Sequence, residues 1–333
     1  MNIKTDKDCD LKLIQSRRVA IIGYGNQGRA QALNLRDSGV DGIVVGSRGG
    51  TPAGELAAAD GFSVLSFAGA VKLADVIVIL LPDEVQGEVY KKHIAPNLRA
   101  GAALVFGHGF SIHFKLIEPA ENLDVILAAP KGPGKTLRAL YREGLGMPCV
   151  IGVHQDASGS ARALALSYAA ALGSGRSGIL ESSFREECET DLFSEQAILC
   201  GGLPALVKAG YEILVEAGYS PELAYIECLH EVKQIADLMW QGGLNFKNQA
   251  ISNTAEFGGY LAGERLVDEK VRAEMKTILA DIQSGRFAKT LMADHQKGFE
   301  KLKSRRAGDA AHEIEKSGLR VRNLMPWLQK KGD

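Results

Sequence analysis

Residues 23–28 read GYGNQG, a G-x-G-x-x-G motif that follows the apolar run VAII and opens a helical pattern. Glycines at these positions permit a tight turn and let the backbone approach a pyrophosphate, which then sits at the N-terminus of the following helix. The motif alone is a weak signal, but strand, turn and helix in this order make it specific. The sequence therefore predicts a dinucleotide site that contains Gly23, Tyr24, Gly25, Asn26, Gln27 and Gly28.

Short β-rich runs alternate with helical stretches between residues 18 and 178. This alternation is typical of βαβ units and predicts a doubly wound α/β fold with a parallel sheet. A helix is expected over residues 27–38, and Thr51-Pro52 indicates the start of another. The predicted strands begin near Val19, Gly42, Val76, Ala102, Asp124 and Cys149.

The second half of the chain has a different pattern, in which apolar residues recur at helical spacing and β-rich runs are almost absent. The change follows the Gly/Ser-rich residues 173–178. We therefore expect an α/β domain over residues 1–181, an all-helical domain over residues 182–328 and a short tail over residues 329–333.

Composition limits the possible partners. The chain has 39 Lys+Arg and 40 Asp+Glu, a formal charge of -1, which disfavours nucleic acid and anionic membranes as partners. We find no apolar run near the roughly 18 residues of a membrane span, and no secretory signal at the N-terminus. The five cysteines include no CxxC. These features predict a soluble, cytoplasmic protein with reduced cysteines.

The end of the second predicted strand bears on the choice of nicotinamide cofactor. NAD-binding relatives of this fold place a carboxylate there for the ribose diol, but this chain reads Gly46-Ser47-Arg48. Arg48 is therefore expected to meet a 2′-phosphate, with hydroxyl donors from Ser47 and Thr51, which favours NADPH. The alternative is that Arg48 is an ordinary solvated loop arginine.

Other polar groups also follow predicted strands, at the edge where cofactors bind in open α/β sheets. His108 and Lys131 are expected to reach a substrate beside the cofactor. The Gly-Pro-Gly turn that ends at Gly134 indicates a close backbone approach to the cofactor or to the second domain. Four further residues are candidates for the cofactor, although the two carboxylates among them also suit a helix N-terminus: Asp83, Glu84, Val85 and Gln86.

Two pairs of carboxylates stand out in the helical half. Asp191 and Glu195 are four residues apart, as are Glu227 and Glu231, so each pair shares one helix face within an otherwise apolar stretch. Four converging carboxylates require cations, and a set of oxygen ligands points to Mg²⁺. The alternative is that both pairs lie on solvated helix faces.

Several segments together resemble ketol-acid reductoisomerases of the short-chain class I. They include GYGNQGRAQALNLRDSG, LLPDE, GHGFSIHF, APKGPGKTLR, EECETDLFSEQAILCGG, YIECLHEVKQIADLMWQGG and AISNTAEFG. The resemblance runs from about residue 6 to residue 328. It implies a Rossmann domain, a knotted helical domain, NADPH, two Mg²⁺ ions per site and an obligate homodimer. Whether dimers assemble into a higher oligomer is left open.

The same resemblance assigns roles to individual residues. It implies that the quartet Asp191, Glu195, Glu227 and Glu231 holds the metals, with the last two supplied by the partner subunit. His108 and Lys131 match catalytic positions and Ser252 matches a substrate contact. Glu231 is a candidate proton relay, and a bound water is the alternative. The implied reaction is alkyl migration in 2-acetolactate or 2-aceto-2-hydroxybutyrate followed by hydride reduction, in valine and isoleucine biosynthesis.

Two other classes of protein remain as alternatives: a metal-independent hydroxyacid dehydrogenase and a non-catalytic NADPH-binding sensor. Five positions also depart from the usual family motifs, which indicates a divergent member and leaves open a specialised pathway with a different acyl substrate. These positions are Asn26, Arg29, Ala53, Gly107 and Lys135.

Overall fold

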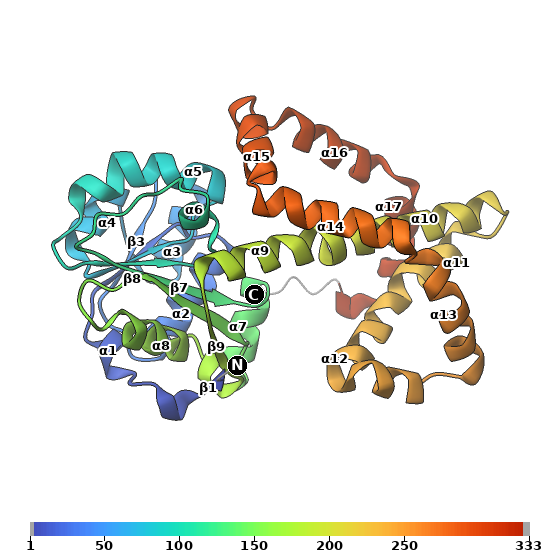
Figure 1. Ribbon diagram of the computed structural model, residues 1–333, viewed down its shortest axis with the longest axis horizontal. Coiled ribbons are helices and arrows are strands. Elements are labelled where there is room, and N and C mark those ends of the chain that lie inside the picture. The colour runs from blue at the N-terminus through green and yellow to red at the C-terminus, as the bar shows by residue number, and fades with distance from the viewer. Residues whose placement is uncertain (1–2, 329–333) are drawn as a thin grey trace. The chain divides into compact units, whose positions relative to one another are not determined.

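The structure is a computed structural model that describes residues 3–328 (Figure 1). The predicted tail at residues 329–333 lies outside the described residues. Contacts divide the chain into two compact units, Met1–Thr190 and Asp191–Asp333. The sequence places the boundary after residue 181, whereas the contacts place it within helix α9 (Phe184–Ser194).

The first unit contains one sheet, whose described strands follow the order β1-β9-β8-β7-β6-β5-β2-β3-β4. Strands β2 to β7 are parallel, and their order β4-β3-β2-β5-β6-β7 is that of a dinucleotide-binding sheet. The strands are β1 (Ile3–Lys4), β2 (Val19–Ile22), β3 (Ile43–Gly46), β4 (Ser63–Leu65), β5 (Val76–Ile79), β6 (Ala103–Phe106), β7 (Asp124–Pro130), β8 (Cys149–Gln155) and β9 (Ile179–Ser182).

The predicted α/β fold is confirmed, with two differences in the sheet. The run at Cys149 predicts another parallel strand, but β8 is antiparallel to β7. The reason is that the chain returns, after the intervening helix, to the edge where β7 ended, so that Pro130 pairs with Cys149. The strands β1, β4 and β9 have no counterpart in the sequence prediction, because each contains polar residues and is only partly buried, so none reads as a continuous apolar run.

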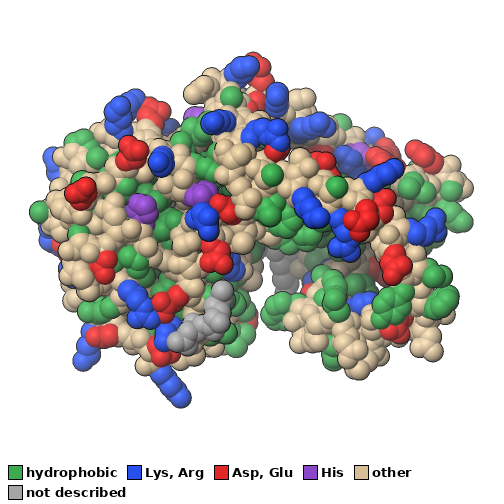
Figure 2. Space-filling model, viewed as in Figure 1, with side chains coloured by type: hydrophobic (Ala, Val, Ile, Leu, Met, Phe, Trp, Pro, Cys, Tyr) green, Lys and Arg blue, Asp and Glu red, His purple; other side chains and the backbone are tan. Residues whose placement is uncertain are grey.

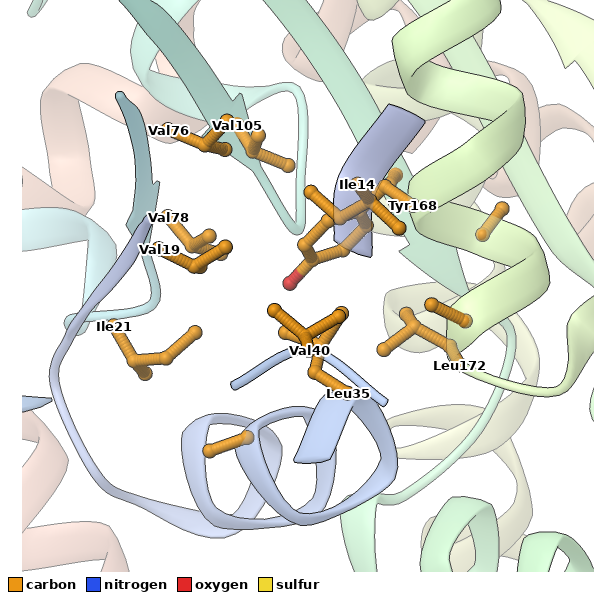
Figure 3. Packing of buried hydrophobic residues seen from close by; sticks show 14 of the residues in the cluster. Ile14, Val19, Ile21, Leu35, Val40, Val76, Val78, Val105, Tyr168 and Leu172 are labelled. Carbon is orange, nitrogen blue, oxygen red and sulfur yellow. The ribbon is translucent and has the colours of Figure 1, made fainter. Parts of the chain in front are cut away.

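Apolar side chains cover both faces of this sheet. Val19, Ile21 and Val78 belong to the core on one face, shown in Figure 3, and Ala20 and Ile22 belong to the core on the other. Successive residues of a strand point to opposite faces, so a strand covered by helices on both sides is buried at every position. This accounts for the continuous apolar runs in the sequence.

The helices of the first unit agree with the sequence at the two predicted positions. Helix α2 (Asn26–Asp37) begins within the glycine motif, directly after Gly25. Helix α3 (Pro52–Ala59) begins after Thr51, whose side chain accepts a hydrogen bond from the backbone of Gly54. The other α-helices are α1 (Lys12–Gln15), α4 (Phe67–Leu73), α5 (Asp83–Val89), α6 (Phe110–His113), α7 (Gly134–Arg142) and α8 (Ala161–Ala171).

The second unit is helical in its described residues, as predicted. It has a small core around Tyr211 and Tyr225. After the end of α9 its elements are η5 (Glu195–Leu199), α10 (Gly202–Glu216), α11 (Pro221–Tyr225), η6 (Ile226–His230), α12 (Glu231–Gln249), α13 (Asn253–Leu266), α14 (Glu269–Gln283), α15 (Arg286–Gln296), α16 (Glu300–Ala311), α17 (Glu313–Asn323) and η7 (Pro326–Leu328).

Much of the apolar surface of this unit is exposed. Helices α12 and α13 contain no buried residue, and Figure 2 shows apolar side chains at their surface. The helical stretch Phe184–Glu216 contains a window of mean hydropathy 1.5, so by length and composition alone it could cross a membrane; 6% of that window is buried. The sequence prediction concerned contiguous apolar runs, which do stay far shorter than a membrane span, and one helix that passes an averaged hydropathy test is weak evidence for such a span.

Candidate active site

The glycine motif forms the turn between β2 and α2, and glycine is favoured at each of its three positions for a different physical reason. Gly23 has φ +101°, a conformation that L side chains rarely adopt. A Cβ on Gly28 would lie 2.0 Å from the carbonyl oxygen of Gly23, so α2 could not approach the turn. A Cβ on Gly25 would meet nothing within 4 Å, which leaves the backbone at the start of α2 open to a pyrophosphate.

The Gly-Pro-Gly turn after Lys131 packs against the glycine motif. A Cβ on Gly134 would lie 2.1 Å from the carbonyl oxygen of Asn26, and the Gln27 side-chain amide donates to the carbonyl of Gly132 at 2.9 Å. The sequence left open whether this turn approaches the cofactor or the second domain. Within the first unit, its close backbone partner is the glycine turn between β2 and α2.

The loop between β3 and α3 carries the residues predicted to meet the 2′-phosphate. The Ser47 hydroxyl lies 3.0 Å from that of Thr51, which donates to the carbonyl of Arg48. The side chain of Arg48 is exposed, and no described residue forms an ion pair with its guanidinium. The loop thus carries one exposed cation next to two hydroxyls that already bond to each other.

Among residues 83–86, which follow β5, Gln86 has a structural role. Gln86 is buried, and its amide donates to the carbonyl of Leu81 and to Asp83, while its oxygen accepts from Ser111. These bonds connect α5 to α6. Asp83 and Glu84 lie in the first turn of α5, as does Val85, at the carboxyl end of β5.

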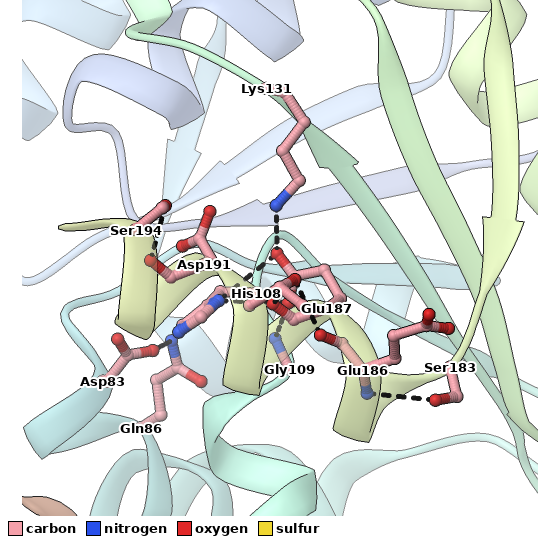
Figure 4. Close-up of polar contacts among 11 residues, drawn as sticks. Asp83, Gln86, His108, Gly109, Lys131, Ser183, Glu186, Glu187, Asp191 and Ser194 are labelled. Carbon is pink, nitrogen blue, oxygen red and sulfur yellow. Dashed lines mark hydrogen bonds and ion pairs between the residues drawn. The ribbon is translucent and has the colours of Figure 1, made fainter. Parts of the chain in front are cut away.

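The carboxyl ends of β6 and β7 meet at a buried carboxylate, shown in Figure 4. The side chain of Glu187, on α9, is only 1% exposed. Its Oε1 lies 2.6 Å from Nζ of Lys131, and its Oε2 lies 3.1 Å from Nδ1 of His108. The backbone N–H of Gly109 donates to the same Oε2 at 2.8 Å. One carboxylate therefore brings together His108 and Lys131, the two residues that the sequence predicts at this edge.

The charges of this cluster stabilise one another. Burial disfavours a charged imidazole, but hydrogen bonds to Cys188 and Glu187 and the negative charges of Glu187 and Asp83 outweigh burial and raise the pKa of His108 to about 11. Burial also opposes ionisation of Glu187, yet its bonds to His108 and Lys131 keep its pKa below the ordinary value. The site thus holds one carboxylate between two cations.

Glu187 is a residue that the sequence interpretation missed. The available signal was its spacing, since Glu187, Asp191 and Glu195 recur every four residues along one helical stretch. Spacing alone could not show that Glu187 is buried whereas Glu195 is exposed.

Each carboxylate pair lies at a break in regular α-helix. Glu195 begins the π-helical turn η5, and Glu227 lies in the π-helical turn η6, directly before Glu231 at the start of α12. Such turns are rare and occur often at functional sites. Asp191 is half-buried and the other three carboxylates are exposed, and the described residues of a single chain do not bring the four into one metal-ligand group.

The predicted substrate contact Ser252 is exposed at the start of α13. Its hydroxyl accepts a hydrogen bond from the backbone N–H of Ala255 at 3.2 Å, which caps the helix. This geometry gives Ser252 a local structural role and leaves its oxygen at the surface.

A sheet in the dinucleotide-binding order, an open glycine turn at its centre and cationic groups on the adjacent strand ends define the class: an oxidoreductase that uses a nicotinamide cofactor. Residues 13–178 match the family model for the NADPH-binding domain of acetohydroxy acid isomeroreductase, and residues 184–327 match that for the C-terminal domain of ketol-acid reductoisomerase. The chain belongs to the ketol-acid reductoisomerase family.

Solved structures agree with this assignment. An NADH-preferring ketol-acid reductoisomerase from an uncultured archean is 44% identical, covers 98% of this chain and 99% of its own, and has a TM-score of 0.95. A putative oxidoreductase from Jannaschia sp. CCS1 is 16% identical over 80% of this chain and 97% of its own, with a TM-score of 0.61. A semialdehyde dehydrogenase NAD-binding protein from Cupriavidus necator has the same identity and TM-score over 81% of this chain and 99% of its own. The last two share the fold alone.

Proposed function

We propose that this chain is a Mg²⁺- and NADPH-dependent ketol-acid reductoisomerase that acts on 2-acetolactate or 2-aceto-2-hydroxybutyrate. The observation that supports it best is the Glu187 cluster, because it holds the cationic groups of His108 and Lys131 at the edge of the sheet where substrate and cofactor meet. A dehydrogenase that works without metal would have no use for the carboxylate quartet on the helices that follow.

The glycine turn fits a dinucleotide, since only Gly25 of its three glycines faces open space. NADPH, when bound, supplies the hydride for the reduction. We favour NADPH over NADH because residues 46–50 offer the cation of Arg48 and no carboxylate. The archaeal relative is NADH-preferring, so the cofactor choice varies within the family and the loop of each member has to be judged by itself.

The oxygen donors of Asp191, Glu195, Glu227 and Glu231 suit Mg²⁺, and both pairs lie at π-helical turns. Divalent cations held there would polarise a carbonyl and acidify a neighbouring hydroxyl, which is the chemistry that an alkyl migration requires.

The protein's own groups then have distinct roles. Lys131 and His108 offer charged N–H donors to the carboxylate and carbonyl oxygens of a 2-hydroxy-3-oxo acid. Glu187 is too deeply buried to meet substrate, so it acts by holding these two side chains. Glu231 accepts the hydroxyl proton, and Ser252 contacts the substrate from the start of α13.

We also propose that the active form is a homodimer in which the partner subunit supplies Glu227 and Glu231. Support comes from the exposed apolar side chains of α12 and α13, among them Trp240 at 84%, Leu244 at 69% and Phe257 at 68%. A surface of this kind marks a protein interface. A second copy of the helical unit would cover it.

Product analysis tests the proposal. NADPH oxidation is followed with 2-acetolactate and with 2-aceto-2-hydroxybutyrate, with Mg²⁺ or with excess EDTA, and the products are identified. We expect a 2,3-dihydroxy-3-alkyl acid that forms only with metal. Turnover of neither substrate would favour a specialised acyl substrate, and metal-independent reduction of simple hydroxy acids would indicate a dehydrogenase instead.

A further inference from the structure

One carboxylate outside the Glu187 cluster connects both segments predicted to hold the dinucleotide. Asp60 directly follows α3. Its Oδ2 accepts from the hydroxyl of Tyr24 at 2.9 Å and from Nε of Arg29 at 2.7 Å, and its Oδ1 accepts from Nη2 of Arg29 at 3.0 Å. Tyr24 belongs to the glycine turn, and Arg29 lies on α2.

The surroundings of Asp60 reinforce this link. Nη1 of Arg36 donates to the backbone carbonyl of Asp60 at 2.7 Å, and the guanidinium of Arg36 lies over the ring of Phe62 at 5.2 Å. Phe62 also packs edge-on against Tyr24, with 5.9 Å between ring centroids. Two arginines of α2 therefore hold the C-terminal end of α3, and the buried ring of Tyr24 is fixed on two sides.

Helix α3 connects Asp60 to the loop between β3 and α3, which is predicted to meet the 2′-phosphate. It spans Pro52–Ala59, about 12 Å of helix at 1.5 Å per residue. Asp60 directly follows the C-terminal end of α3. The loop that carries Ser47, Arg48 and Thr51 directly precedes its N-terminal end. A dinucleotide bridges this loop and the glycine turn, so its affinity depends on their separation, whereas a ligand that touches one segment is insensitive to it.

We propose that Asp60, paired with Arg29, is a positioning residue that fixes the glycine turn and the β3–α3 loop relative to each other for dinucleotide binding. The inference rests on the proposed use of a nicotinamide dinucleotide at this turn. It also gives a reason for Arg29, one of the positions at which the chain departs from the usual family motif.

The test compares four variants of the full-length protein. Asp60→Asn removes the charge, Tyr24→Phe removes only the hydroxyl, and Arg29→His removes the guanidinium that pairs with Asp60. Glu181→Gln is the matched control, because Glu181 makes a similar two-point ion pair with Arg162 of α8. Glu181 lies on β9, far from β2 in the strand order. The readouts are NADPH and NADH affinity by fluorescence titration, affinity for adenosine 2′-monophosphate by competition, steady-state constants and the melting temperature.

We expect Asp60→Asn to weaken both dinucleotides and raise their KM roughly five- to twentyfold, with kcat and adenosine 2′-monophosphate affinity within about twofold of the unmodified protein. Combining it with Tyr24→Phe should add little, since both changes break one network. The proposal would be overturned if Asp60→Asn bound the dinucleotides as tightly as Glu181→Gln does. It would also be overturned if Asp60→Asn lost affinity for the dinucleotides and for adenosine 2′-monophosphate equally.

If Asp60→Asn does not fold, Tyr24→Phe and Arg29→His decide the question by the same comparison. Binding by the unmodified protein separates a failure of the proposed function from a failure of the role of Asp60. If it fails to bind either dinucleotide, the proposed function is wrong; if it binds and the variants bind equally well, only the role of Asp60 is wrong.

Discussion

Nζ of Lys131 lies 2.6 Å from Oε1 of Glu187, and the Glu187 side chain is almost completely shielded from solvent. Lys131 follows β7, whereas Glu187 is on α9, more than 50 residues later in the chain. The same carboxylate contacts His108 after β6. Glu187 thus holds the ends of β6 and β7 and the first part of α9 in one arrangement.

Replacing Glu187 by Gln should reduce kcat by roughly 10²- to 10³-fold, because His108 and Lys131 lose the charge that orients them. Loss of a buried, charged hydrogen-bond partner should also lower the free energy of unfolding by about 1–3 kcal/mol. Steady-state kinetics and chemical denaturation measure the two effects. Glu186→Gln is the control, since Glu186 is exposed beside it and bonds to Ser182; an equal loss of kcat in both variants would contradict the assigned role.

Local sequence patterns were enough to predict the features that depend on neighbouring residues. The glycine turn, the Thr51-Pro52 helix start and the edge shared by His108 and Lys131 each follow from a motif or from strand alternation. The structure has these features where the sequence places them.

Features that depend on distant contacts were not predictable in this way. The direction of β8 depends on where the chain returns after α7, and the burial of Glu187 depends on packing between α9 and strands far away in sequence. The partner of Gly134 is the backbone of Asn26, which no periodicity indicates. For Glu227 and Glu231, the proposed completion of the site lies in a second copy of the chain.

The glycine turn offers a prediction that separates binding from folding. Gly25→Ala should fold with an unchanged melting temperature but bind NADPH at least roughly tenfold more weakly, because its methyl group enters the open space over the turn. Gly28→Ala should instead lower the melting temperature, since its Cβ would lie 2.0 Å from the carbonyl oxygen of Gly23. Gly308→Ala on α16 is the control, with nothing within 4 Å of its Cβ and no part in the predicted cofactor site. Strong cofactor binding by Gly25→Ala would rule out this site.

Arg48 should determine cofactor preference. A charge-assisted contact to the 2′-phosphate predicts roughly ten- to a hundredfold preference for NADPH over NADH. Arg48→Ala should raise the KM for NADPH and leave that for NADH nearly unchanged. Arg17→Ala, an exposed arginine before the opposite end of β2, should affect neither constant. Equal use of both cofactors by the unmodified protein would show that the loop does not read the phosphate.

The proposed dimer predicts complementation between inactive variants. Asp191→Asn and Glu227→Gln should each abolish turnover, and mixing them under subunit exchange should restore part of it, since a heterodimer regains one intact site. Native mass spectrometry verifies the exchange. Persistent inactivity after verified exchange would mean that all four carboxylates of a site come from one chain.

The metal dependence of turnover tests the account most directly. NADPH oxidation with 2-acetolactate is measured for the unmodified protein and for Glu195→Gln, over a range of Mg²⁺ concentrations and in excess EDTA, with Glu216→Gln on α10 as the control. We expect the rate to be lower by a factor of about a hundred or more in EDTA and in Glu195→Gln, with an unchanged melting temperature and normal activity of the control. Full activity in EDTA, or undiminished activity of Glu195→Gln, would contradict it.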